Sequence, residues 1–125
     1  MPFMQAQEQG MLDWVCGGAN PTRPASRWIS FATGSPNDAG ASDGPFQSRV
    51  TCTFAAAASP TQSATNANAM SLATATAAAT VVGWNLWNSS AGGVRLAYGT
   101  ATAAIGCKSG DNVVIGAGAL VITLK

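Results

Sequence analysis

The chain contains no histidine, and it has few charged residues of either sign. Histidine is the side chain that most often serves as a general base near neutral pH. Only 9% of the 125 residues are Asp, Glu, Lys or Arg, against about 25% in an average globular protein. We therefore expect a protein that is not an enzyme, with no catalytic residues, no bound metal and no other cofactor.

Grouped cations and long apolar runs are also missing. The net charge is +1, and the six basic residues form no cluster, whereas phosphate binding needs several cations together. No apolar run approaches the ~18–20 residues that cross a bilayer. The first ten residues lack the basic region and apolar core of a signal peptide, and Glu8 argues against one. We expect no nucleic-acid partner, no membrane partner and synthesis in a cytoplasm.

Cysteine is scarce and odd in number. Cys16, Cys52 and Cys107 are isolated, so the sequence shows neither a zinc-binding spacing nor a complete internal disulfide framework. Cys52 lies in an alternating segment, and we interpret it as a small buried hydrophobic residue. Cys16 and Cys107 are candidates for an interchain disulfide, which would form only in oxidising surroundings. Lys108 is the basic neighbour of Cys107, but the pair is more typical of a strand end than of a nucleophile.

The heaviest apolar unit in the chain lies at residues 81–98. Val82, Trp84 and Leu86 alternate with their neighbours, and a period of two predicts a half-buried strand with these three side chains on one face. The Ser- and Gly-rich segment at residues 88–93 predicts a turn, and the alternation resumes after it. We expect a β-hairpin against which the rest of the chain packs.

Other segments show weaker signals. Apolar residues at helical spacing in residues 5–15, followed by a Gly-Gly pair, predict a short helix, and the prolines at residues 20–24 predict an extended connector. Residues 34–44 are rich in Gly, Pro, Asn, Asp and Ser, so we expect an exposed loop. Further strands are expected at residues 27–33, 49–54, 69–73, 102–107, 111–115 and 119–124. In the last of these, Leu120, Ile122 and Leu124 should face the core.

About eight short strands at spacings of 8–12 residues indicate an all-β fold. We therefore expect a mainly β fold, an antiparallel β-sandwich or jelly roll with one short N-terminal helix. Residues 1–24 would form the helix and connector, and residues 25–125 the β-sandwich domain. The low-complexity run of Ala, Thr, Ser and Asn at residues 55–79 gives only the strand at residues 69–73.

Five motifs in one order resemble a known family. They are LDWVCGG at residues 12–18, SRWISFATGSP at residues 26–36, RVTCTF at residues 49–54, WNLWNSSAGGVRLAYG at residues 84–99 and SGDNVVIGAGALVITL at residues 109–124. In this pattern the chain resembles a family of small tailed-phage virion proteins, often labelled tail-fibre or minor structural proteins. Two positions depart from the family, with Gly83 where histidine is common and Asn88 where an acidic residue is common. The resemblance implies a virion component and brings no catalytic residues.

Within that class, the sequence favours a capsid decoration or cement protein, because a chain of one compact domain has no shaft from which to form a fibre. Its partners would be the major capsid protein or other virion subunits, and further copies of itself, since a weakly charged surface has little repulsion to keep copies apart. Alternatives are a tail, neck or fibre component, and a carbohydrate-binding module for adhesion to cells. In each case the mature protein would be located in the virion.

The N-terminal helix and the loop at residues 34–44 are the expected contact elements. Asp38 and Asp43 share that loop, but they lack the ligand spacing of a calcium-binding EF-hand. The tryptophans suggest either core packing or a sugar-stacking platform. Trp84 and Trp87 lie on an alternating strand, so one of them must face inward, and the other is left for an interface. The candidate interface residues are Phe3, Met4, Met11, Trp14, Trp28, Asp38, Asp43 and Trp87.

Overall fold

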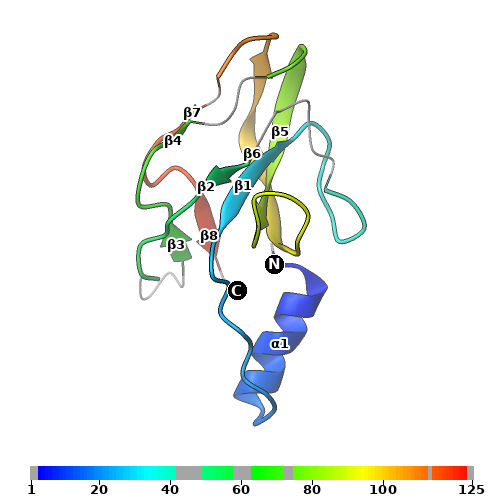
Figure 1. The fold of residues 1–125 in the computed structure, drawn as a ribbon, viewed down its shortest axis with the longest axis vertical. Coiled ribbons are helices and arrows are strands. Elements are labelled where there is room, and N and C mark those ends of the chain that lie inside the picture. Colours follow the sequence, from blue (N-terminus) through cyan, green and yellow to red (C-terminus); the bar gives the residue numbers. More distant parts are fainter. Residues whose placement is uncertain (1–2, 42–48, 58–62, 72–74, 113, 124–125) are drawn as a thin grey trace.

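The computed structural model describes residues 3–41, 49–57, 63–71, 75–112 and 114–123 (Figure 1). Within these residues the chain is mainly β, with one short helix near the N-terminus, which confirms the expected fold class. The elements are α1 (Gln5–Val15), β1 (Trp28–Ala32), β2 (Val50–Thr51), β3 (Ser63–Thr65), β4 (Met70–Ser71), β5 (Ala79–Trp87), β6 (Arg95–Cys107), β7 (Val114–Ile115) and β8 (Val121–Thr123).

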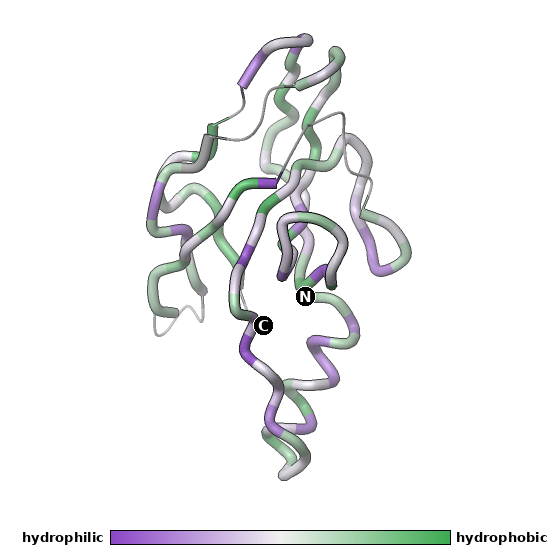
Figure 2. The backbone as a smooth tube through the Cα atoms, in the orientation of Figure 1, coloured by the Kyte–Doolittle hydropathy of each residue, from purple (hydrophilic) through white to green (hydrophobic). Residues whose placement is uncertain are grey.

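The strands form two antiparallel layers. A four-stranded sheet has the order β2-β1-β5-β6, and the two short pairs β3-β8 and β4-β7 lie beside one of its faces (Figure 1). Both layers contribute to one apolar core, which includes Ile29 and Phe31 from β1 and Ile122 from β8. Figure 2 shows hydrophobic residues (green) in strands of both layers. The arrangement is sandwich-like, because each layer buries one face against the other.

The expected hairpin is present as β5 and β6, with an irregular ladder. Val81 pairs with Ile105 and Gly83 with Thr100, so the register shifts between these two pairs. A bulge reverses the alternation of side chains that follows it. Trp84 and Leu86 are buried as predicted, but on the other side of the shift Val81 is buried while Val82 is only half-buried. The prediction that Val82 shares the core face was therefore wrong.

A glycine makes room for the central tryptophan. Trp84 lies opposite Gly99 in the β5-β6 ladder, and a Cβ atom at Gly99 would come within 2.6 Å of the Trp84 ring. The indole therefore packs flat over a position that has no side chain, as aromatic residues do across from strand glycines. The return strand of the hairpin and the strand expected at residues 102–107 are one strand, because β6 runs without interruption from Arg95 to Cys107.

The second face of the central sheet is covered by the loop that follows β1. Arg95 is buried, and its Nη1 atom donates hydrogen bonds to Gly40 O and to Asn85 Oδ1, both at 2.9 Å. Its Nη2 atom donates to Asn37 O. Asn85 in turn donates from Nδ2 to Ala41 O at 2.8 Å. These bonds hold residues 37–41 against β5 and satisfy polar groups that would otherwise be buried at a cost.

Other strands differ from expectation in length and partner. The segment at residues 49–54 pairs with β1 only at Val50–Thr51, and then Phe54 forms a bridge with Asn66 in the other layer. The expected strand is shorter because the chain crosses between layers there. Strand β3 lies in the low-complexity run and was missed, since its residues have no apolar alternation. Leu120 and Ile122 are buried as predicted, whereas Leu124 and residues 72–73 lie outside the described residues.

Candidate protein interface

The helix α1 projects from the end of the sandwich and has no buried residue (Figure 1). Its N-terminal end is fixed to the body at three points. Met4 N donates to Leu96 O at 3.0 Å, Phe3 forms an antiparallel bridge with Ala97, and Gln5 N donates to Asp38 Oδ1 at 3.2 Å. The carboxylate of Asp38 therefore caps the positive end of the helix. The remainder of α1 extends away from the sheet.

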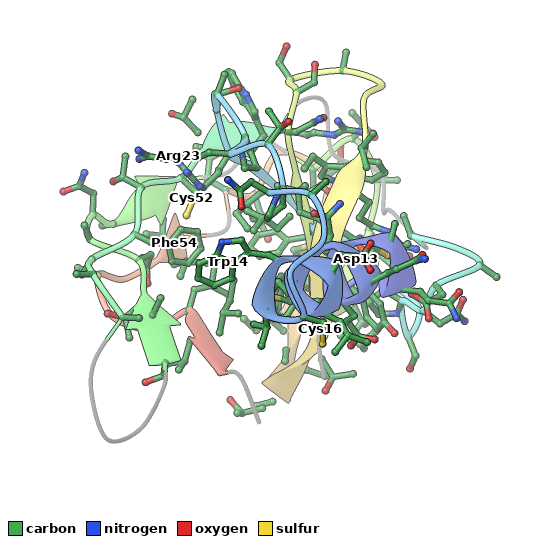
Figure 3. The ribbon with its side chains drawn as sticks, turned by 90° about the horizontal axis from the view of Figure 1, so that it is seen from below. Asp13, Trp14, Cys16, Arg23, Cys52 and Phe54 are labelled. Atoms are coloured by element: carbon green, nitrogen blue, oxygen red, sulfur yellow. The ribbon has the colours of Figure 1, made fainter. Side chains whose placement is uncertain are left out.

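The free end of α1 exposes large apolar side chains. Leu12 is 63% exposed, Trp14 58% and Val15 73%. With Met11, which is partly covered, they are spaced three or four residues apart and so share one side of the last helical turns. We call Met11, Leu12, Trp14 and Val15 the apolar arc. Asp13 and Trp14 point to opposite sides of the helix in the view from below (Figure 3), so the arc carries no charge.

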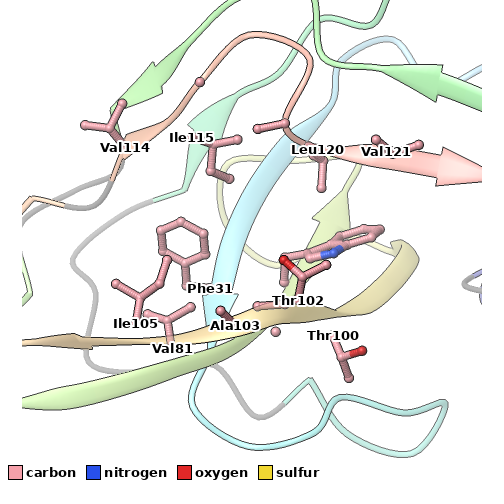
Figure 4. Close-up of a pocket in the computed structure, with 15 residues that line it drawn as sticks. Phe31, Val81, Thr100, Thr102, Ala103, Ile105, Val114, Ile115, Leu120 and Val121 are labelled. Carbon is pink, nitrogen blue, oxygen red and sulfur yellow. The ribbon is translucent and has the colours of Figure 1, made fainter.

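A second apolar surface lies between the two layers, where the sandwich is open along β6. This groove, called the β6–β8 groove, has a volume of about 380 Å³. Side chains from opposite walls face each other across it (Figure 4), with Phe31, Val81 and Ile105 on one wall and Ile115, Leu120 and Val121 on the other. All of its lining residues are uncharged. Thr102 and Ala103 are exposed at the β6 rim.

The tryptophans in the central sheet are engaged within the chain. The guanidinium carbon of Arg49 lies 3.7 Å from the centroid of the Trp87 ring, and Arg49 Nη1 also donates to Ser89 O and Gly92 O at 2.8 Å each. The Trp87 indole N–H donates to Ser30 Oγ at 2.9 Å. Because Arg49 covers one face of Trp87 by a cation–π contact, that face is closed to a stacking sugar.

The remaining candidate interface residues are dispersed. Trp28 is half-buried, and its indole N–H donates to Ser26 Oγ at 3.1 Å. Phe3 packs against the core, Met4 precedes the first turn of α1, and Asp38 caps that turn. Asp43 lies outside the described residues. The structure brings Phe3, Met4 and Asp38 together at the helix base, whereas Met11 and Trp14 lie at the free end and Trp28 and Trp87 in the sheet.

The three cysteines occupy different environments. Cys16 is exposed at the end of α1, whereas Cys52 and Cys107 are buried. Burial raises the pKa of the Cys52 thiol from 9.0 to about 11, although Arg27 opposes the shift. The Cys107 thiol donates to Ala79 O at 3.2 Å. A disulfide to another copy is sterically open to Cys16 as the chain is folded, and Cys107 would first have to leave its buried position.

Sequence reasoning found the helix but missed three features of the interface. Leu12 and Val15 were noted at helical spacing but not named as interface residues, although both are exposed. The β6–β8 groove has no sequence signal because its walls come from distant segments. Arg49 as the cover of Trp87 was also missed. An exposed apolar helix face and a buried one have the same sequence pattern. The face is exposed here because α1 projects away from the sheet, and that projection depends on tertiary contacts.

Two absences apply to the described part of the chain. No group of three or more His, Cys, Asp or Glu side chains there is arranged to hold a metal ion. No helix there is long and apolar enough to cross a membrane.

Comparison with known proteins identifies the family. No curated protein matches the chain. The sequence profile of the family described as podophage GP4 fiber I protein gp80 matches residues 2–123, so the match includes α1, both layers and the groove. This extent confirms the expected resemblance to phage virion proteins. The chain belongs to the family of podophage GP4 fiber I protein gp80 and is a structural protein of a phage virion.

Proposed function

We propose that the chain is a fibre subunit of a podophage particle and that it docks on other virion proteins through α1. The observation that carries this proposal is the family match over residues 2–123, because the family is described by a fibre protein. It supports a location on a particle appendage over the capsid decoration that the sequence favoured.

The exposed helix supplies a physical means of docking. The base of α1 is fixed by Phe3, Met4 and Asp38, so its apolar arc is presented in a defined direction. A preorganised surface loses less conformational freedom on binding than a flexible segment. Aromatic and aliphatic side chains that enter a partner's pocket usually contribute most of the binding energy of an interface, and Trp14 and Leu12 are suited to that role.

The proposed role is structural and involves no catalysis. A cysteine nucleophile reacts as the thiolate, and burial keeps Cys52 protonated well above neutral pH. Cys107 is buried, and its thiol is hydrogen-bonded to a backbone carbonyl. These placements support an inert, core-packing role for both thiols.

Capsid decoration is the second candidate. It is favoured by the compact sandwich, which has no elongated shaft in the described residues. In that case many copies would bind the assembled shell and stabilise it by mass action, because they would bind the assembled state and not the dissociated one. The family description supports this candidate less well than it supports the fibre.

Immunogold electron microscopy of purified particles tests the proposal. Antibodies against the folded chain should label appendages of the particle and leave the shell unlabelled. Preincubation of the antibodies with purified protein is the control, and it should abolish the label. Uniform label over the shell would contradict the fibre role and favour decoration.

A further inference from the structure

We propose that the chain binds a second copy of itself, with the apolar arc of one copy seated on the β6–β8 groove of the next. The inference deepens the proposed fibre function and rests on it in naming the partner, because it assigns α1 a neighbouring copy of the same chain. It starts from two exposed apolar surfaces that one molecule carries at separate places.

The two surfaces match in chemistry and size. The groove is about 380 Å³ in volume and lined only by uncharged residues, and Leu12, Trp14 and Val15 form an uncharged group at the helix end. The volume admits a few side chains and not a whole helix, so α1 would lie across the opening with part of the arc inserted. Such insertion removes apolar area of both partners from water.

Within one copy the two surfaces do not meet. The helix is attached where Met4 binds Leu96, at the start of β6, whereas the groove is lined by residues 100–105 farther along the same strand. From its attachment α1 runs away from the groove (Figure 1). The arc therefore stays exposed in the single chain. A second copy can bring a helix to the groove without any change in the fold.

Charge favours this contact over a contact between two helices. The helix carries Glu8 and Asp13 and no basic residue, whereas the rest of the chain carries all six basic residues and three acidic ones. Two helices side by side would pair elements of the same negative net charge. A helix on the body of another copy instead brings an element of negative net charge to a body of positive net charge. Complementary charge of this kind disfavours the contact between two helices.

The contact is heterologous, because it joins two different surfaces. Each copy would offer one helix and one groove, so it would bind one neighbour through each. Repeated heterologous contacts give a closed ring or an open chain of subunits. Both outcomes build an assembly from a small single-domain subunit.

Crosslinking between two distinguishable copies tests the contact. One copy keeps Cys16, which follows the apolar arc directly, and the other carries Cys16→Ser with Thr102→Cys at the rim of the groove. A short bismaleimide added to the mixture should give mixed dimers. Cys52 and Cys107 are buried in both copies and should contribute little background.

The matched control replaces Thr102→Cys by Ser90→Cys, an exposed position at the tip of the β5-β6 hairpin. It should give few mixed dimers. Three results would each overturn the proposal. They are equal crosslinking at both positions, dimers that join only Cys16 to Cys16, and the absence of any dimer.

Sedimentation of variants of the full chain gives an independent measure. Leu12→Ser with Val15→Ser should raise the dissociation constant of self-association at least about tenfold, since apolar anchors usually dominate an interface. Thr102→Glu should do the same, because docking would bury its carboxylate. Ala6→Ser, near the base of α1 and outside the apolar arc, should change the constant by less than about twofold. Circular dichroism verifies that each variant is folded.

If the unmodified chain stays monomeric at high concentration, or if its helix binds only a different virion protein, the proposal is wrong. That result would leave the fibre role intact, because immunogold labelling of particles decides the fibre role separately.

Discussion

Arg95 is a buried cation that holds a loop on the central sheet. It binds the carbonyl groups of Asn37 and Gly40 and the side chain of Asn85. A planar guanidinium donates in several fixed directions, which a lysine ammonium cannot match. The chain has few charged residues, and it places this one where its removal would take the charged donor from two loop carbonyl groups and from the buried Asn85 side chain.

Replacing Arg95→Met should therefore lower the free energy of unfolding by about 2–4 kcal/mol, since buried acceptors lose their charged donor. Urea unfolding followed by tryptophan fluorescence measures the change. Arg95→Lys should restore only part of the loss. The control is Arg23→Met, at an exposed position, which should change the stability by less than about 0.5 kcal/mol. Equal effects at the two positions would refute the role given to Arg95.

At the scale of elements, the β5-β6 hairpin depends on the contact of Trp84 with Gly99. The indole occupies space that a Cβ atom at Gly99 would need, at 2.6 Å from its nearest ring atoms. Trp84 is 9% exposed and packed in the core, so it has little freedom to move aside. Trp84 also lines the β6–β8 groove, so this contact lies next to one wall of the groove.

Gly99→Ala should destabilise the fold by about 1–3 kcal/mol, because the added methyl group overpacks the core. Gly106→Ala is a matched control on the same strand, since a Cβ atom there meets no atom within 4 Å. It should be neutral or slightly stabilising. Thermal unfolding of both variants makes the comparison. A loss at Gly106 as large as that at Gly99 would show that strand glycines matter here for a reason other than Trp84.

Elements with regular patterns were predictable from the sequence, and those defined by tertiary contacts were not. Helix α1 and strand β1 were found because apolar spacing, Gly and Pro mark them. The burial of Val81 in place of Val82 was not predictable, because a register shift in the ladder changes the alternation without changing the sequence pattern. Strand β3 was missed because Ser63–Thr65 owes its conformation to pairing with β8.

The candidate site was predictable only as a segment. Residues 5–15 were identified as a contact helix, but the pattern that predicts an amphipathic helix also predicts that its apolar face is buried. The exposure of Leu12 and Val15 follows from the anchoring of Phe3 and Met4 to β6, which directs the helix outward. The groove joins residues from five strands and the segments next to them, so no local window of sequence contains it.

At the scale of the whole molecule, the chain combines a sandwich with a projecting helix and an open apolar groove. Soluble monomers rarely expose contiguous apolar surface without an interaction that uses it. The charge-poor composition also favours association, because a net charge of +1 gives copies little mutual repulsion. The family match places these surfaces on a phage particle, where neighbouring subunits are always present.

The most direct measurement for the fibre role is the copy number of the chain in purified particles, determined by quantitative mass spectrometry against the major capsid protein. A shell contains hundreds of subunits, whereas its single tail carries few appendages. We expect a few to a few tens of copies per particle. Hundreds of copies, in a fixed ratio to the capsid protein, would contradict the fibre role and identify a protein that covers the shell.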